Sequence, residues 1–212
     1  MLTPTFLTSA AITFFLALLA WASTRRLRLE PTPWQTALEA MYDAAQNAVQ
    51  EVLPQHAARI MPFVATLWLF ILVANLAGVI PGLRSPTADI STTAALAVIV
   101  FISVHAYGIR IRGLRGYLRH YVEPNPVMLP FHLISELSRT LALAVRLFGN
   151  IMSLELTALL VLLVAGFLVP VPVLMLHIVE ALVQAYIFGM LALVYIGGAL
   201  QAQEERTLAK EK

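Results

Sequence analysis

Ionisable side chains lie inside long apolar stretches in the second half of the sequence, and these are the residues whose types could do chemistry. Each costs about 2.5–3.5 kcal/mol to place at the centre of a membrane on insertion scales, so such residues usually face protein or water and mark an ion pathway. The chemistry that they predict is therefore the movement of an ion across a membrane. They are Glu136, Arg139, Arg146, Glu155, His177 and Glu180.

Helical spacing sorts the groups of the first stretch onto two surfaces. Arg139, Arg146 and Asn150 are seven and four residues apart and share one face of a helix. Glu155 follows Arg146 by nine residues, which places it on the opposite face and roughly 13 Å further along the axis. Arg146 and Glu155 therefore cannot form a simple ion pair within one helix.

The second stretch carries His177, Glu180 and Gln184 at positions i, i+3 and i+7, again on one face. We expect this face to pack toward Glu155 and to line a hydrated path with it. The other interpretation is that the three side chains only form hydrogen bonds between helices.

Glu136 and Arg139 lie near the start of their apolar stretch. We interpret both as secondary, structural residues. Their spacing allows Glu136 to be the i+3 partner of Arg139.

Apolar segments long enough to cross a membrane must position these groups. The chain has 212 residues, of which 59% are hydrophobic and only 12% charged, whereas an ordinary soluble domain is about one quarter charged. The mean hydropathy is +0.80. We predict an all-α membrane protein that forms one domain, with five membrane-crossing helices of about 20 residues or more. The predicted spans are residues 2–23, 60–80, 92–109, 131–167 and 173–200.

Residues 34–53 differ from the spans because their apolar residues recur on one helical face while the other face is polar and acidic. This pattern predicts an amphipathic helix at the membrane interface rather than a span. Residues 201–212 are polar and predict a solvated tail. The apolar residues of the amphipathic pattern are Leu38, Met41, Ala45, Val49 and Val52.

The positive charges predict the orientation. Arginines cluster after the first span, at 25, 26 and 28, and after the third, at 110, 112, 115 and 119, whereas the opposite loops hold only Arg84. Positive residues favour the cytoplasmic side, so the N-terminus is expected outside and the C-terminus in the cytoplasm. A signal peptide carries its positive charge before the apolar run, so we expect residues 2–23 to be retained.

Composition and motifs also exclude functions. The net charge is only +2 and the arginines lie between spans, which argues against nucleic-acid binding. There are no cysteines, and no phosphate loop, metal-ligand cluster or nucleophile–base arrangement is found, so no cofactor, metal or active site is expected. A stand-alone secondary cation/proton transporter and a structural membrane scaffold remain as alternatives.

Four segments resemble one family. LALAVRLFGNIMSLE at 141–155 resembles the signature of subunit a of F-type ATP synthases, and the other three support it by their order and spacing. The resemblance covers roughly residues 35–200. The supporting segments are NLAGVIPG at 75–82, SPTADISTT at 85–93 and HIVEALVQAYIF at 177–188.

This resemblance implies roles for the buried groups. Arg146 would face the rotating ring of c subunits, with Asn150 beside it, and the last two helices would be long and tilted against that ring. Glu155, His177 and Gln184 would line two aqueous half-channels, whereas Glu180 is an additional carboxylate on the same face.

The resemblance also implies partners and a location. The chain would be a non-catalytic subunit that carries H⁺ or Na⁺ and is joined by b-type peripheral stalk subunits to a soluble catalytic head. The absence of a transit peptide and the outside-in start favour a multi-pass protein of a bacterial inner membrane.

Overall fold

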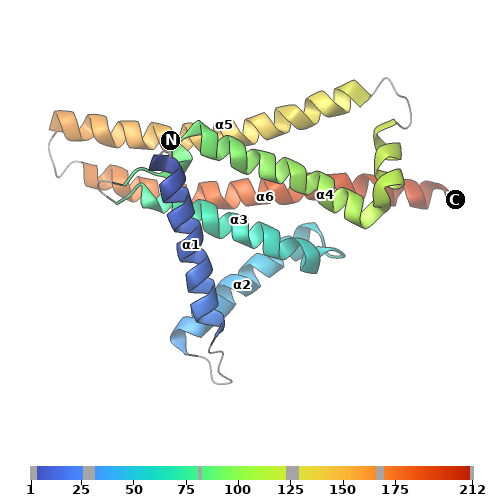
Figure 1. The fold of residues 1–212 in the computed structure, drawn as a ribbon, viewed down its shortest axis with the longest axis horizontal. Helices are drawn as coiled ribbons and strands as arrows, with labels where there is room; N and C mark the ends of the chain where they lie inside the picture. The colour runs from blue at the N-terminus through green and yellow to red at the C-terminus, as the bar shows by residue number, and fades with distance from the viewer. Residues whose placement is uncertain (1–3, 26–31, 81–82, 123–128, 166–169, 211–212) are drawn as a thin grey trace.

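The computed structural model describes residues 4–25, 32–80, 83–122, 129–165 and 170–210. Within these ranges the chain forms helices and no strand (Figure 1). The predicted all-α architecture is therefore confirmed. The elements are α1 (Pro4–Thr24), α2 (Pro33–Val52), α3 (Ala57–Ala77), the short 3₁₀ helix η1 (Pro86–Ala88), α4 (Ile90–Val122), α5 (Leu129–Ala165) and α6 (Pro170–Lys210).

Five of these helices are long and apolar enough to cross a membrane, as the hydropathy pattern predicts. The exception among α1 to α6 is α2, which packs against α3 and α6 and buries Val49 in their shared core. Thr32 caps its start by accepting a hydrogen bond from the Gln35 backbone N–H, and Pro33 occupies the first turn, where its missing donor costs nothing. The spans are Thr5–Thr24, Ala57–Ala77, Ile90–Ile111, Pro130–Val164 and Val171–Gly198.

Two helices continue past the ends of the predicted spans. The segment labelled α4 runs to Val122, with a break at Gly113, whose φ of 73° is a left-handed conformation that glycine adopts without strain. The last helix begins at Pro170 and continues to Lys210, through most of the predicted tail. Gln, Glu, Ala and Leu dominate residues 201–210, and these are strong helix formers.

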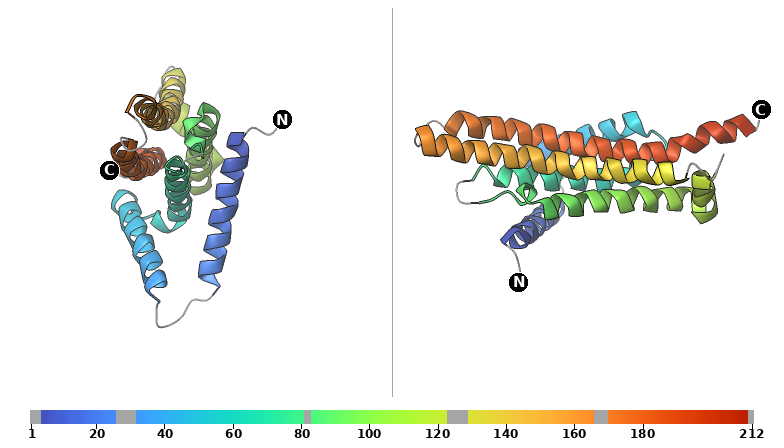
Figure 2. Two further views of the ribbon diagram at one scale, coloured as in Figure 1. Left: turned by 90° about the vertical axis from the view of Figure 1, so that its left-hand side faces the viewer. Right: turned by 90° about the horizontal axis from the view of Figure 1, so that it is seen from above.

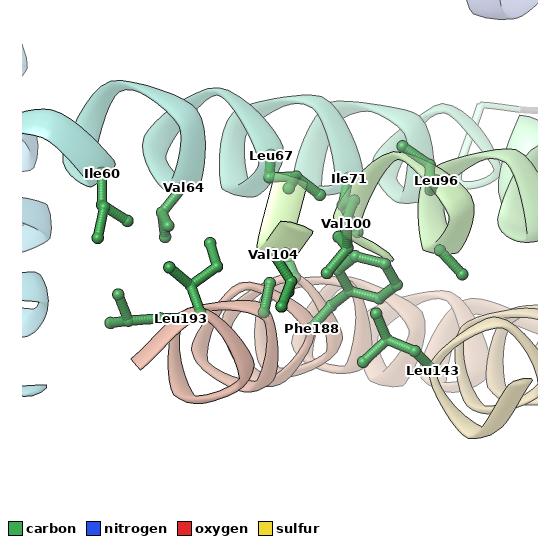
Figure 3. Packing of buried hydrophobic residues seen from close by; sticks show 14 of the residues in the cluster. Ile60, Val64, Leu67, Ile71, Leu96, Val100, Val104, Leu143, Phe188 and Leu193 are labelled. Carbon is green, nitrogen blue, oxygen red and sulfur yellow. The ribbon is translucent and has the colours of Figure 1, made fainter. Parts of the chain in front are cut away.

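The hydrophobic core lies where α3, α4, α5 and α6 meet (Figures 2 and 3). Ile60, Val64 and Ile71 on α3 are fully buried and point toward Phe188 and Leu193 on α6 (Figure 3). Within membrane spans such a core is held by close van der Waals packing between helices, since lipid is as apolar as these side chains. The core therefore holds α6 along α3 and sets the depth of the polar residues that α6 carries.

The start of α4 is fixed by Asp89. Its Oδ1 accepts hydrogen bonds from the backbone N–H of Ser91 at 2.9 Å and from the Ser91 hydroxyl at 2.7 Å. The Thr5 hydroxyl of α1 donates to Oδ2 at 3.0 Å. The hydrogen bond from the Ser91 backbone, followed by that from its side chain, lowers the pKa of the Asp89 carboxyl below its ordinary value. Asp89 thus ties α1 to the loop that precedes α4.

Candidate ion pathway

Glu155 on α5 and His177 on α6 converge at the end of α3. The Oε1 atom of Glu155 accepts a hydrogen bond from the backbone N–H of Ser85 at 2.9 Å. Gly78 follows α3 directly, and a Cβ at this position would lie 3.1 Å from Glu155 Oε1 and 3.2 Å from His177 Cε1. Glycine therefore leaves the space in which the carboxylate and the imidazole approach each other.

A buried polar network supports this meeting point. The Ser85 hydroxyl donates to the Ala74 carbonyl at 2.8 Å and lies 2.6 Å from Thr87 Oγ1, and the Thr87 hydroxyl donates to Asn75 Oδ1 at 2.6 Å. Asn75, Ser85 and Thr87 are all at most 2% exposed. No local sequence pattern marks these three residues as part of the site, although they lie in segments that carry the family resemblance.

Two nitrogen atoms of this region are buried without a hydrogen-bond partner in the described part of the chain. They are His177 Nε2 and Asn75 Nδ2. Buried polar groups in proteins are nearly always paired with protein or with water, so each exception needs an explanation. A hydrated ion path between α3, α5 and α6 would supply one.

A second contact joins the two helices nearer the middle of the bundle. The Asn150 side-chain amide donates to Gln184 Oε1 at 2.7 Å. Gln184 is 1% exposed, and its Nε2 atom has no described partner. The polar face of α6 therefore meets α5 at two levels, with His177 near Glu155 and Gln184 at Asn150. The spacing pattern predicts packing toward Glu155 but does not indicate the second contact. Glu180 lies between these levels, is half-buried and has no partner among the described side chains.

Arg146 lies one turn before Asn150 on α5, and its side chain is exposed. No hydrogen bond or ion pair joins it to any residue that the structure describes. Gly149 beside it is equally open, with no atom within 4 Å of the place where a Cβ would stand. This part of α5 thus presents a positive charge with free space next to it.

Glu136 and Arg139, which the sequence suggests are structural, lie at the other end of α5. Each of them contacts a different helix. Glu136 Oε2 lies 3.7 Å from His105 Nε2 on α4. The guanidinium of Arg139 lies 5.6 Å from the ring centroid of Tyr195 on α6, a cation–π contact. Neither contact is indicated by the i+3 spacing, because both partners come from other helices.

Comparison with known proteins supports one family. The ATP synthase A chain family matches residues 5–197. ATP synthase subunit a 2 of Pelobacter propionicus is 62% identical over 98% of this chain and 91% of its own length. ATP synthase subunit a of Legionella pneumophila is 60% identical over 96% of this chain and 89% of its own length. A more distant relative, ATP synthase subunit a 2 of Picosynechococcus sp., is 50% identical over 88% of this chain.

These relatives cover nearly the whole chain, and their similarity includes all five apolar spans. Since ATP synthase subunit a is a non-catalytic component of a multi-subunit complex, no active site of its own is needed to account for the polar groups described above. The chain is a multi-pass membrane protein and belongs to the ATP synthase A chain family.

Proposed function

We propose that this chain is the ion-conducting stator subunit of a rotary F-type ATP synthase. Two half-channels carry H⁺ or Na⁺ to and from carboxylates on a ring of c subunits, and this flow couples to ATP synthesis or hydrolysis. The b-type peripheral stalk subunits connect the chain to the soluble catalytic head. The orientation is that predicted by the arginine clusters, in a bacterial inner membrane.

The observation that carries the proposal is the guanidinium of Arg146, which is paired with none of the residues that the structure describes. An arginine within a membrane span is costly and is normally paired or in contact with water. Arg146 is exposed on α5 and has no described partner within its own chain. Its partner is therefore expected on another chain, and a ring carboxylate has the complementary charge.

Arginine suits this position because it stays protonated in any protein environment. A ring carboxylate must be neutral, by protonation or by ion binding, while it faces lipid. Beside Arg146 the opposite charge favours its ionised form and so releases the bound ion. The same fixed charge repels a cation that would otherwise leak directly between the two half-channels.

The outer half-channel is proposed to begin where Glu155 and His177 meet Gly78. The unpartnered His177 Nε2 and Asn75 Nδ2 atoms are consistent with water in this region. The path then continues along α6 past Glu180 to Gln184, whose contact with Asn150 brings it within one turn of Arg146.

The test is ATP-driven ion uptake by inverted membrane vesicles that carry the whole complex. Arg146→Ala is expected to abolish uptake while the catalytic head still hydrolyses ATP. The matched control is Arg84→Ala, which removes an exposed arginine from the α3–α4 loop and should leave uptake unchanged. Repeating the assay with and without Na⁺ identifies the ion.

Undiminished uptake by an assembled Arg146→Ala complex would reject this proposal and favour a structural scaffold. Ion exchange by the purified single chain in liposomes would instead favour a stand-alone transporter.

A further inference from the structure

We propose that Glu136 and His105 form a second carboxylate–histidine group, at the cytoplasmic mouth of the pathway, which holds one exchangeable proton and sets the dependence of transport on cytoplasmic pH. The inference rests on the proposed function, because it takes the pathway and its orientation from there. It assigns a transport role to Glu136, which its i+3 spacing from Arg139 suggests is structural.

The pair joins α4 to α5 in a half-buried position. Glu136 Oε2 and His105 Nε2 are 3.7 Å apart, and their side chains are 20% and 28% exposed. Both side chains thus keep part of their surface uncovered by the chain itself while they face each other.

The hydrogen bonding of His105 fixes which nitrogen exchanges a proton. Its Nδ1 atom lies 2.8 Å from the Phe101 carbonyl oxygen of the preceding turn. A carbonyl oxygen only accepts, so Nδ1 must donate and carries the hydrogen in both charge states. The nitrogen left to accept or give up a proton is therefore Nε2, the one that faces Glu136.

The position of the pair mirrors that of Glu155 and His177. Glu136 precedes Arg146 by ten residues, about 15 Å along α5, and Glu155 follows it by nine, about 13 Å. Glu136 lies beside His105 of α4, and Glu155 and His177 of α6 both lie beside Gly78. Toward each end of α5, Arg146 is thus flanked by a region that holds one carboxylate and one histidine.

An exposed face of α5 connects the inner pair to the arginine. Arg139, Ala142 and Arg146 follow one another at helical spacing, and all three are exposed. Ala142 is small, so this face is open between the two charged side chains. An ion released beside Arg146 can leave along it toward Glu136.

The exchange conserves charge and atoms. When Glu136 is protonated, its O–H bond breaks and an N–H bond forms at His105 Nε2, which leaves a carboxylate beside an imidazolium. The imidazolium then gives this proton to cytoplasmic water as hydronium. If H⁺ is the transported ion, these steps relay it. If Na⁺ is transported, deprotonation of His105 leaves the Glu136 carboxylate free to attract the cation.

Other titratable and charged groups lie at this end of the bundle and will influence the pair. Arg139 follows Glu136 by three residues on α5 and lies over the Tyr195 ring. Tyr107 on α4 donates to the Arg59 backbone carbonyl of α3 at 3.4 Å. The groups on the packed helices are Arg59 on α3, Tyr107 and Arg110 on α4, His132 and Arg139 on α5, and Tyr195 on α6.

The test exploits the sidedness of inverted vesicles, in which the medium contacts the cytoplasmic face and the lumen contacts the outer face. Uptake by the complete complex is measured while the pH of each side is varied separately, and every rate is divided by that of wild type at the same pH. His105→Gln and Glu136→Gln remove the two titrating groups, and Glu136→Asp retains the carboxylate if the neutral variant fails to assemble. His177→Gln and Arg146→Ala are assayed in parallel.

We expect His105→Gln to reduce uptake by about ten- to a hundredfold, at or below the lower end of what a positioned proton-transfer group contributes. Its rate relative to wild type should vary with the pH of the medium, because the variant lacks a group that responds to that pH. The same ratio should stay constant as the lumenal pH is varied. The double variant with Glu136→Gln should be no slower than the slower single variant, and Glu136→Asp should keep part of the medium-pH dependence. His177→Gln should instead alter the dependence on lumenal pH.

Wild-type dependence on the pH of the medium in assembled His105→Gln and Glu136→Gln complexes would overturn the inference, as would a change confined to lumenal pH. If Arg146→Ala still loses uptake in the same vesicles, only the role of the Glu136–His105 pair is rejected. If Arg146→Ala keeps full uptake, the proposed function itself fails.

Discussion

Asn150 on α5 donates a 2.7 Å hydrogen bond to the side-chain carbonyl of Gln184 on α6, one helical turn from Arg146, which has no partner among the described residues. Gln184 is 1% exposed, so the bond is protected from solvent on the α6 side. It fixes the relative depth of the two helices beside the arginine. The hydrogen bond therefore holds the polar face of α6 at the same depth as Arg146 on α5.

The first prediction concerns this bond. Gln184→Leu should leave the Asn150 amide without its partner, which typically costs about 1–3 kcal/mol when the group is buried. Uptake in vesicles should slow, and the double variant with Asn150→Leu should lose less than the two single losses combined, because contacting residues are coupled. Strictly additive losses would show that the two side chains act independently. Ion uptake and thermal dissociation of the complex provide the measurements.

Gly78 provides a prediction about space rather than bonding. An alanine Cβ there would press against both Glu155 Oε1 and His177 Cε1, so Gly78→Ala should crowd the pocket and slow ion entry from the outer side. Overpacking of this kind typically costs about 1–3 kcal/mol. Gly198→Ala is the matched control, because nothing lies within 4 Å of its Cβ position and helix propensity favours alanine. Equal uptake by the two variants would contradict the proposed entry site.

The close approach of Trp68 to Gly189 predicts that a substitution at Trp68 can offset the damage caused by a substitution at Gly189. The indole of Trp68 donates to the Tyr186 carbonyl at 3.2 Å, stacks on the Tyr186 ring at a centroid distance of 5.9 Å, and occupies the space where a side chain at Gly189 would lie. Gly189→Ala should therefore displace α6 from α3 and lower both assembly and uptake, at a cost of about 1–3 kcal/mol. Trp68→Leu combined with Gly189→Ala should recover part of the loss. If the double variant is worse than Gly189→Ala alone, steric conflict with Trp68 is not the cause.

Asp89 predicts a stability effect with a defined pH range. Loss of a helix-capping side chain costs about 1 kcal/mol, so Asp89→Ala should lower the temperature at which the complex dissociates. The hydrogen bonds from Ser91 place the pKa of the folded carboxyl below its ordinary value of 3.8. Ionised Asp89 therefore stabilises the fold above that pH, and the contribution is lost only as the pH falls through the lowered pKa. The difference between wild type and Asp89→Ala should be constant from about pH 8 to pH 5, and a difference that disappears near pH 6 would exclude this cap as its source.

The sequence by itself determined the class of protein and the spans. Long uninterrupted apolar stretches cross a membrane as helices. The reason is that the backbone N–H and C=O groups of each segment find no water there and must be hydrogen-bonded within the segment. It also singled out Arg146, Glu155 and His177, since the cost of burying an ionisable group makes each one conspicuous. Residues 34–53 are distinguished from the spans because one face of their helical pattern is polar and acidic.

Only the tertiary structure decided which polar groups meet. Asn75, Ser85 and Thr87 lie at a span end and in a loop, where polar residues are ordinary, and no local pattern shows that the loop folds back onto Glu155. Likewise, i+3 spacing suggests Arg139 as the partner of Glu136, whereas the packing of α4 against α5 places His105 beside Glu136. Periodicity assigns a residue to a face of its own helix, but the neighbour of that face is set by how the cores of different helices pack.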